Sequence, residues 1–138
     1  AKYILDKIGI TVGDDVKVIL MEAKEDHPFV QVELMMPILP LVRVPDVDQA
    51  IEMAVRVEHG NRHTAMMHSR NVEKLTKMAK LIQTTIFVKN GPSYAGIGVG
   101  GEGYTTFTIA GPTGEGLTSA KSFARRRRCV LVGGMDVR

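Results

Sequence analysis

The strongest constraint on the fold is an alternation of strand-like runs with amphipathic helical stripes between residues 38 and 88. Residues 38–44, 63–68 and 85–88 are short, largely apolar runs of strand length. The segments between them carry apolar residues at helical spacing: Val47, Ala50, Ile51, Ala54 and Val55 in the first, and Val72, Leu75, Met78, Ala79 and Ile82 in the second. Strands that alternate with helices over short connections predict parallel pairing and right-handed crossovers. The expected fold class is therefore α/β, a portion of a parallel sheet with its helices.

Cap and turn residues set the expected boundaries of these elements. Asp46 or Asp48 is expected to cap the first helix, and Gly60 to end it. Ser69 is expected to cap the second helix. Pro40 has no backbone donor, so it predicts an edge strand, a bulge, or a strand that starts one residue later.

The amino-terminal quarter predicts one more helix and one more strand. Residues 2–8 place apolar side chains at helical spacing and stop at Gly9, which suits a helix end. Residues 16–21 form a strand-like run. A charged turn then leads into the apolar segment 29–34.

The carboxyl-terminal third differs from the rest of the chain in amino-acid composition. Glycine and proline become frequent after residue 90, which favours turns and close backbone approach. The β-prone residues 104–109 interrupt them. A short helix at 115–124 and a terminal strand at 128–132 are expected to follow.

The composition is typical of one globular domain, with 138 residues of which 44% are apolar and 24% charged. No run approaches the ~18 apolar residues that cross a bilayer, and the amino terminus lacks a charged-then-apolar signal pattern. We therefore expect no membrane partner and a cytoplasmic location. The single Cys129 fits a reducing compartment, since it has no disulfide partner within the chain. The initial Ala1 is consistent with processing or with a fragment boundary.

The net charge of +3 depends on the four consecutive arginines Arg125, Arg126, Arg127 and Arg128. A nucleic-acid-binding surface usually spreads basic residues over one face, with aromatic or polar residues between them. Here the rest of the chain mixes both signs. Nucleic acid is therefore not the expected partner. An arginine-rich binder of anions or nucleic acid is the least favoured functional hypothesis for this chain.

The single cysteine and the histidines do not form a self-sufficient site. Cys129 follows four arginines, which favour a thiolate, but it lies in an apolar CVLV run with no histidine nearby in the sequence. A core cysteine is the preferred interpretation. His63 and His68 are five positions apart, so on a strand they point to opposite faces and cannot share a metal ion. The preferred interpretation of these two and His59 is surface or core histidine, with one of them lining a pocket. The sequence therefore predicts no catalytic residue and no metal site.

Two further patterns concern nucleotides. Gly98, Gly100 and Gly103 match a G-x-G-x-x-G spacing, but β-prone residues follow where a pyrophosphate needs a helix N-terminus, so the match is false. Glu33 precedes an apolar strand, where its carboxylate would stand at the rim of the sheet and accept hydrogen bonds from ribose hydroxyls. The alternative is an ordinary solvated glutamate at a strand end.

Four stretches of sequence carry a resemblance to a known family. They are HPFVQVELMMPILPLVRV from His27, EHGNRHTAMMHS from Glu58, GPSYAGIGVGGEGYTTFTIAGPTGEG from Gly91 and SFARRRRCVLV from Ser122. Together they resemble the C-terminal part of the CoA-acylating aldehyde dehydrogenases, the acetaldehyde and propionaldehyde enzymes of ethanolamine and propanediol utilisation. The resemblance implies a part of the catalytic domain over residues 1–126, with an oligomerisation strand and tail over residues 127–138.

The resemblance also implies roles for individual residues. In this superfamily the glutamate of a Glu-x-Phe-Gly-Pro-like motif holds the ribose on the nicotinamide side of NAD. Glu33 with Pro37 resembles that motif, with Met35 and Met36 in place of Phe and Gly. The turn after TIFVKN resembles the one beside the substrate tunnel. The pocket residues that it implies are Asn90, Gly91, Pro92, Ser93 and Tyr94.

The reaction that the resemblance implies uses NAD and coenzyme A. A cysteine thiolate attacks the aldehyde, the thiohemiacetal gives a hydride to NAD, and coenzyme A takes the acyl group from the thioester. The family's nucleophile and nucleotide-binding domain lie upstream of a segment like this one. The chain alone is thus expected to form one wall of the site and not to turn over.

The alternative hypothesis is a non-catalytic assembly fragment of the same family. The terminal strand at 128–132 resembles the one that joins another subunit's sheet, which implies a homo-oligomer. The family also makes enclosure in a bacterial microcompartment an expectation.

Overall fold

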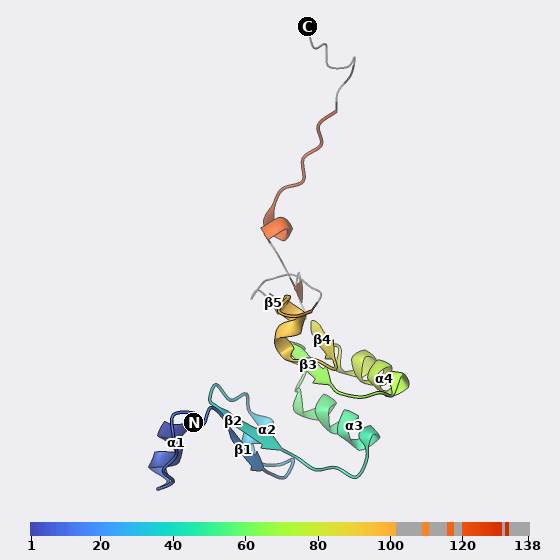
Figure 1. Cartoon of the computed structure of the whole chain (residues 1–138). Coiled ribbons are helices and arrows are strands. Elements are labelled where there is room, and N and C mark those ends of the chain that lie inside the picture. Colours follow the sequence, from blue (N-terminus) through green and yellow to red (C-terminus); the bar gives the residue numbers. More distant parts are fainter. Residues whose placement is uncertain (102–108, 111–115, 118–119, 131, 133–138) are drawn as a thin grey trace.

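The computed structural model describes residues 1–101, 109–110, 116–117, 120–130 and 132. Short helices and strands follow one another, and residues 124–130 extend away from them (Figure 1). The described elements, in chain order, are α1 (Lys2–Lys7), β1 (Ile19–Glu22), α2 (Pro28–Gln31), β2 (Ile38–Leu41), α3 (Val47–Val57), β3 (Thr64–Met67), α4 (Val72–Ile82), β4 (Ile86–Lys89), the 3₁₀ helix η1 (Ser93–Ile97), β5 (Ile109–Ala110), β6 (Gly116–Leu117) and the 3₁₀ helix η2 (Ala120–Phe123).

Strands β1 and β2 form a parallel pair in which Ile19 lies opposite Ile38. Strand β1 begins three residues later than predicted, and β2 ends three residues earlier. The carbonyls of Pro37 and Leu41 accept hydrogen bonds from the β1 side, so Pro40 faces the open edge of the pair. The missing donor of Pro40 therefore breaks no ladder bond, and the edge-strand alternative is confirmed.

Helix α2 separates these two strands and was not predicted from the sequence. The ring nitrogen Nδ1 of His27 accepts a hydrogen bond from Phe29 N at 3.1 Å, and Pro28 occupies the first helical position. Residues 32–37, between α2 and β2, have no regular structure. Glu33 therefore precedes a strand, as expected, but it stands in an irregular segment five residues before β2.

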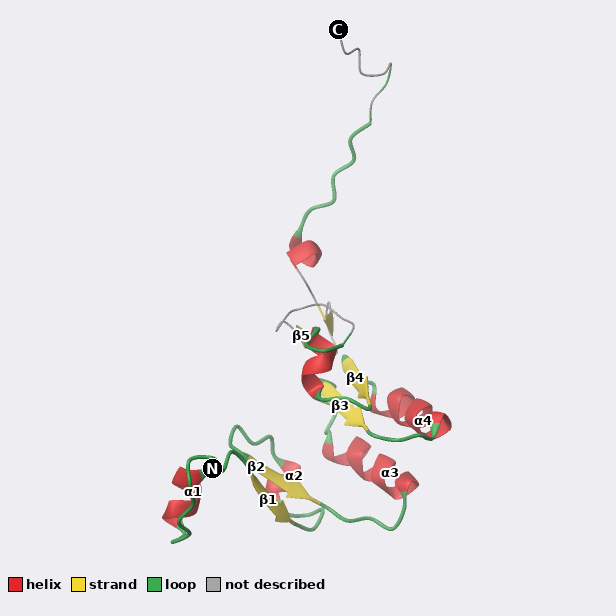
Figure 2. Ribbon diagram, in the orientation of Figure 1, coloured by secondary structure: helices red, strands yellow, loops and turns green. Residues whose placement is uncertain are grey.

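Strands β3 and β4 form a second parallel pair, joined by α4, with Thr64 opposite Ile86. Helices α3 and α4 lie beside this pair (Figure 2). The two predicted apolar stripes meet in one core. Its buried members are Ile51, Met78 and Ile82, and the half-buried side chains packed on it are Ala54, Val55, Ala65, Met67 and Phe87. The parallel direction is confirmed, and so are the stripes except at Val47 and Val72, the first residues of the two helices, which are exposed.

One of the expected parallel pairs does not form among the described strands. Strands β2 and β3 are not hydrogen-bonded to each other, and the described strands form separate two-stranded sheets. A helix between two strands fixes their parallel direction, but about a third of consecutive strands are not neighbours. The crossover through α3 therefore leads from one parallel pair to the next.

The N-cap of α3 agrees with the sequence and that of α4 does not, and α3 ends at Val57, three residues before the expected Gly60. Asp46 caps α3, since its Oδ1 accepts a hydrogen bond from Gln49 N at 2.9 Å. Asn71 caps α4 instead of Ser69, and its Oδ1 accepts from Lys74 N at 3.0 Å. The hydroxyl of Ser69 accepts from the backbone of Asn71 and so supports the cap from outside the helix.

The structure differs from the sequence-based predictions in the carboxyl-terminal third of the chain. Of the helix predicted at 115–124, the described residues show a short strand at Gly116–Leu117 and a 3₁₀ turn at Ala120–Phe123. Most of the β-prone segment 104–109 lies outside the described residues. Residues 128–130 form no strand, because a strand is defined by a ladder partner and none of the described residues pairs with them. Cys129 is exposed, so the core interpretation is wrong for this chain.

Asp48 links the two core helices through a pair of lysines. Lys74 Nζ lies 2.8 Å and 2.7 Å from the two carboxylate oxygens of Asp48, and Lys77 Nζ lies 2.8 Å from one of them. Hydrogen bonds from Lys74 and then from Lys77 lower the pKa of Asp48 from 3.8 to about 2. The pKa of Lys77 is raised by its hydrogen bond to Asp48.

A depressed carboxylate pKa predicts a pH-dependent contribution to stability. The contribution is complete above pH 3.8 and is lost as the pH falls through about 2, where the folded state must bind the proton. Asp48→Asn should lower the midpoint of thermal unfolding near neutral pH, and the difference from the parent should shrink across that acidic window. Circular dichroism measures both midpoints, with Asp26→Asn as an exposed-carboxylate control. Equal midpoints of parent and Asp48→Asn near neutral pH would contradict the role.

Gly96 allows η1 to lie directly on β4. A Cβ at position 96 would overlap Cγ2 of the buried Ile86 and come within 3.3 Å of Val88 Cγ2. Gly96→Ala should therefore lower the free energy of unfolding by ~1–3 kcal/mol in urea denaturation. In an Ile86→Ala background the loss should be smaller, because the overlapped methyl group is gone. The same loss in both backgrounds would show that the overlap is not the cause.

Candidate functional site

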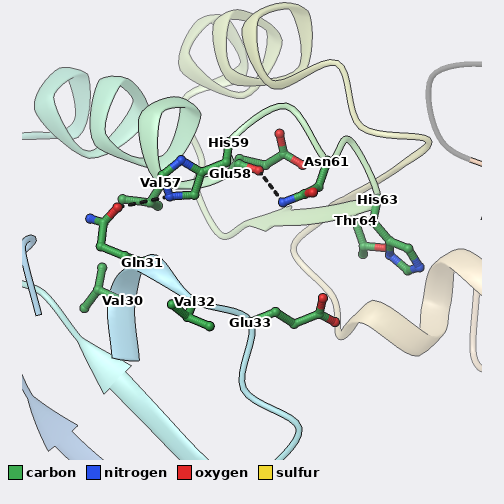
Figure 3. A pocket seen from close by; sticks show the side chains of 10 residues that line it. All are labelled: Val30, Gln31, Val32, Glu33, Val57, Glu58, His59, Asn61, His63 and Thr64. Atoms are coloured by element: carbon green, nitrogen blue, oxygen red, sulfur yellow. Dashed lines mark hydrogen bonds between the residues drawn. The ribbon is translucent and has the colours of Figure 1, made fainter. Parts of the chain in front are cut away.

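A cavity of about 490 Å³ lies between the segment after α2 and the end of α3 (Figure 3). One wall runs from Val30 to Glu33. The facing wall comes from the end of α3, the turn after it and the start of β3: Val57, Glu58, His59, Asn61, His63 and Thr64. The lining mixes carboxylate, amide, imidazole and hydroxyl groups with valines, so it suits a ligand with several hydroxyl groups.

Glu33 is exposed on its wall of this cavity. Figure 3 shows its side chain extending toward the side where His63 and Thr64 lie. Nδ1 of His63 is 2.6 Å from Oγ1 of Thr64, so these two side chains are held together. Within the described part of the chain, no hydrogen bond or ion pair is formed by the Glu33 carboxylate. The carboxylate is thus placed to accept hydrogen bonds from a ligand.

Pro37 does not share the cavity with Glu33. Its carbonyl accepts a hydrogen bond from Ile19 N at 2.8 Å, which ties the far end of the segment to β1. Met35, between the two residues, is 92% exposed. Of the two predicted cofactor residues, the structure brings Glu33 to a cavity and gives Pro37 a position that anchors the segment.

A second cavity, of about 410 Å³, lies at the end of β4. Three of the five predicted pocket residues line it: Asn90, Gly91 and Pro92. Ser93 and Tyr94 belong to η1 and do not line it, and the Tyr94 side chain is exposed. Its other walls are Phe87, Val88, Lys89, Ala95, Gly96, Gly100 and Gly101. The two cavities have no lining residue in common, so the predicted cofactor and substrate residues do not meet within this chain.

Asn90 is committed to the backbone of a neighbouring loop. Its Oδ1 accepts from Ser69 N at 2.7 Å, and its Nδ2 donates to Ser69 O at 3.0 Å. Asn90 has a φ of 56°, in the left-handed region that asparagine tolerates better than most residues. The side chain therefore joins the ends of β3 and β4 and shapes the second cavity from its edge.

The other patterns weighed in the sequence provide no site in the described residues. Within the described ranges, no group of three or more His, Cys, Asp or Glu side chains is placed to hold a metal ion. Gly98 and Gly100 have positive φ angles after η1, and Gly103 lies outside the described residues. No helix in the described ranges is long and apolar enough to cross a membrane.

Two residues of the first cavity were not predicted as a pair. Nε2 of His59 lies 3.0 Å from Oε1 of Gln31, and this contact joins the two walls of the cavity. The alternatives for His59 were a metal ligand and a surface or core histidine, with one of the histidines lining a pocket, and no role was predicted for Gln31. The residues are 28 positions apart, so no local spacing pattern reveals the contact.

Comparison with known proteins gives the family. The model of the aldehyde dehydrogenase family matches residues 17–116. The acetylating acetaldehyde dehydrogenase EutE of Salmonella typhimurium is 56% identical over 130 residues, which are 94% of this chain and 28% of that enzyme. The family match thus covers more than half of the chain.

Solved structures agree with this match. The propionaldehyde dehydrogenase of Rhodopseudomonas palustris, with bound CoA and an acylated cysteine, is 75% identical with a TM-score of 0.88, over 95% of this chain and 30% of that one. The propionaldehyde dehydrogenase of the Clostridium phytofermentans fucose utilisation bacterial microcompartment is 54% identical with a TM-score of 0.86, over 100% of this chain and 32% of that one. The chain spans less than a third of the length of these relatives. It belongs to the aldehyde dehydrogenase family.

Proposed function

We propose that the chain is part of an NAD-dependent, CoA-acylating aldehyde dehydrogenase, which converts an aldehyde, coenzyme A and NAD to acyl-CoA and NADH. The observation that carries the proposal is the cavity lined by Glu33, whose carboxylate has no partner among the described residues, in a chain 75% identical to an enzyme solved with CoA and an acylated cysteine. In the whole enzyme NAD would accept the hydride, and coenzyme A would supply the thiol that takes the acyl group.

Glu33 is the residue that we assign to the cofactor. An ionised carboxylate accepts hydrogen bonds and donates none, so it complements the hydroxyl groups of a ribose. The exposed position of Glu33 on a cavity wall supports this role. Pro37 acts indirectly, because its carbonyl bond to Ile19 fixes the far end of the segment that carries Glu33.

The turn from Asn90 to Tyr94 is the part that we assign to the aldehyde. Gly91 and Pro92 offer a wall without long side chains, and this supports a pocket for a small substrate. The Asn90 amide is occupied by Ser69, so its role is to hold the turn in place and not to contact the aldehyde. Ser93 and Tyr94 do not line this cavity, so their proposed part is to continue the turn into η1.

No residue of this chain is assigned as the nucleophile. Cys129 is exposed in the extended segment near the carboxyl end, beyond both cavities. The proposal therefore gives the chain binding and positioning roles. The microcompartment relative from Clostridium phytofermentans supports a cytoplasmic enzyme enclosed in such a compartment.

A graft tests the proposed role of Glu33. This chain would replace the segment that it matches in the Rhodopseudomonas palustris enzyme, to which it is 75% identical. The grafted enzyme should form NADH from propionaldehyde and coenzyme A. Glu33→Gln in the graft should lower kcat/KM for NAD by roughly 10- to 100-fold, because a charged group with two acceptor oxygens is replaced by a neutral amide with one acceptor and a donor. The KM for propionaldehyde should change less than about twofold.

Glu73→Gln is the matched control for the graft, since Glu73 is exposed on α4 away from both cavities. The isolated chain should form no NADH from the same substrates. Turnover by the isolated chain that disappears in Cys129→Ser would contradict our assignment of the nucleophile to another part of the enzyme. An unchanged kcat/KM for NAD in Glu33→Gln would contradict the cofactor role.

A second function, assembly through the carboxyl-terminal segment, is favoured by the exposure of apolar residues there. The side chains of Phe123, Val130 and Val132 are 70%, 69% and 91% exposed. Residues 125–130 are outside any strand and form no backbone hydrogen bond with another described residue, which leaves backbone groups suited to a sheet edge. We infer that this segment pairs with another subunit.

A charge placed in this segment tests the assembly function. Val130→Asp in the grafted enzyme should shift the molar mass from an oligomer to a smaller species, because a buried carboxylate opposes pairing. Light scattering after size-exclusion chromatography, with a reductant to keep Cys129 reduced, measures the mass. Ala124→Asp, upstream of the predicted strand, should leave the mass unchanged. An unchanged mass in Val130→Asp would rule out this segment as the interface.

A further inference from the structure

The turn that follows α3 is held by Glu58 through both its backbone and its side chain. The Glu58 carbonyl accepts hydrogen bonds from Asn61 N at 3.2 Å and from Asn61 Nδ2 at 2.9 Å. The Glu58 carboxylate accepts a further bond from the backbone of Arg62. The carbonyls of Arg62 and His63 then accept from Thr85 and Ile86 at the start of β4. The turn is thus fixed at one end to α3 and at the other to the sheet.

His59 takes an unusual backbone conformation in this turn. Its φ is 55° and that of Arg62 is 54°, two left-handed non-glycine residues within four positions. Such conformations persist where surrounding contacts over-determine them, and they cluster at functional sites. In this turn the conformation accompanies a side chain that crosses the cavity, with His59 Nε2 3.0 Å from Oε1 of Gln31 (Figure 3).

The Gln31 amide is oriented by a second contact. Its Nε2 donates to the carbonyl of Glu25 at 2.6 Å, so its Oε1 is the atom that faces His59. His59 Nε2 is therefore the donor. Glu25 is itself bound to α3, since its two carboxylate oxygens accept hydrogen bonds from Nε of Arg56 at 3.0 Å and from Nη2 of Arg56 at 3.1 Å. The α2 region is attached to the end of α3 at two points.

Glu33 lies two residues beyond Gln31, in a segment without regular structure. Two residues span at most ~7 Å of extended chain, so a fixed Gln31 restricts where the Glu33 backbone can lie. Pro37 fixes the other end of the segment through Ile19. Since the Glu33 carboxylate has no partner of its own among the described residues, its position depends on these two anchors.

We infer that His59 is a positioning residue, whose hydrogen bond to Gln31 sets the Glu33 carboxylate at the distance from the facing wall that its ligand requires. The inference rests on the proposed role of Glu33 toward the ribose of NAD. His59 acts through Gln31 and contacts no reacting atom. Because His59 only positions Glu33, its loss should lower kcat/KM for NAD and leave kcat/KM for the aldehyde unchanged.

Three variants in the grafted enzyme test the inference. His59→Leu removes the donor at similar volume, and it should lower kcat/KM for NAD about 10-fold through misplacement of Glu33. His59→Gln keeps an N–H donor at about the same reach, and it should remain within about twofold of the parent. Both substitutions meet the same left-handed backbone, so their difference isolates the hydrogen bond. His68→Leu, at an exposed histidine on the far end of β3, should not change kcat/KM.

Combination with Glu33→Gln separates this inference from the proposed function. If His59 acts through Glu33, the double variant Glu33→Gln/His59→Leu should have the same kcat/KM for NAD as Glu33→Gln alone. An effect of Glu33→Gln without a difference between His59→Leu and His59→Gln would overturn the positioning role and leave the proposed function standing. No effect of Glu33→Gln would overturn the proposed cofactor role, whatever His59 does. Equal losses of aldehyde and NAD use in His59→Leu would indicate a general structural role and also overturn the inference.

Discussion

The packing of α3 against α4 is the contact on which the rest of the described structure depends. Ile51 of α3 meets Met78 and Ile82 of α4 over the β3–β4 pair, and burial of these side chains is the main apolar gain in this part of the chain. The direction of α3 then decides where the helix ends, and hence the position of His59, which follows it. The direction of α4 decides where β4 ends, and hence where Asn90 stands.

The polar contacts around the first cavity set position more than stability. The Arg56 and Glu25 side chains are 57% and 36% exposed, and ion pairs at such exposure contribute little to folding. Their bidentate geometry nevertheless fixes the orientation of the α2 region relative to α3. The same holds for His59 and Gln31. Contacts of this kind fix the geometry of the cavity wall but add little to the free energy of unfolding. Substitutions there should therefore change kcat/KM more than they change stability.

Local periodicity was enough to predict the core helices, whereas features that depend on distant contacts were missed. The stripes that contain Ile51 and Met78 were predictable because helical spacing is a local property. Asn71 was missed as a cap because Ser69 is an equally good residue type two positions earlier. The contact of His59 with Gln31 and the separation of β2 from β3 depend on chain path, which periodicity does not encode. The exposure of Cys129 was missed because an apolar run predicts burial only where a partner surface exists.

The assignments of Glu33, Pro37 and residues 90–94 came from family resemblance, and spacing alone favoured an ordinary glutamate at position 33.

The β1–β2 pair connects the cavity to a surface that the described residues leave exposed. Leu20 lies opposite Leu39, and both are exposed on the same face of the pair. Parallel strands are normally covered on both faces, because their crossovers place other elements there. The relatives of this chain are more than three times its length, and we expect the part of the proposed enzyme outside this chain to cover Leu20 and Leu39. The bond between Pro37 and Ile19 passes the position of that pair directly to the segment that carries Glu33. Glu33 is thus held from two sides, by a helix end that this chain packs itself and by a sheet whose outer face depends on the rest of the enzyme.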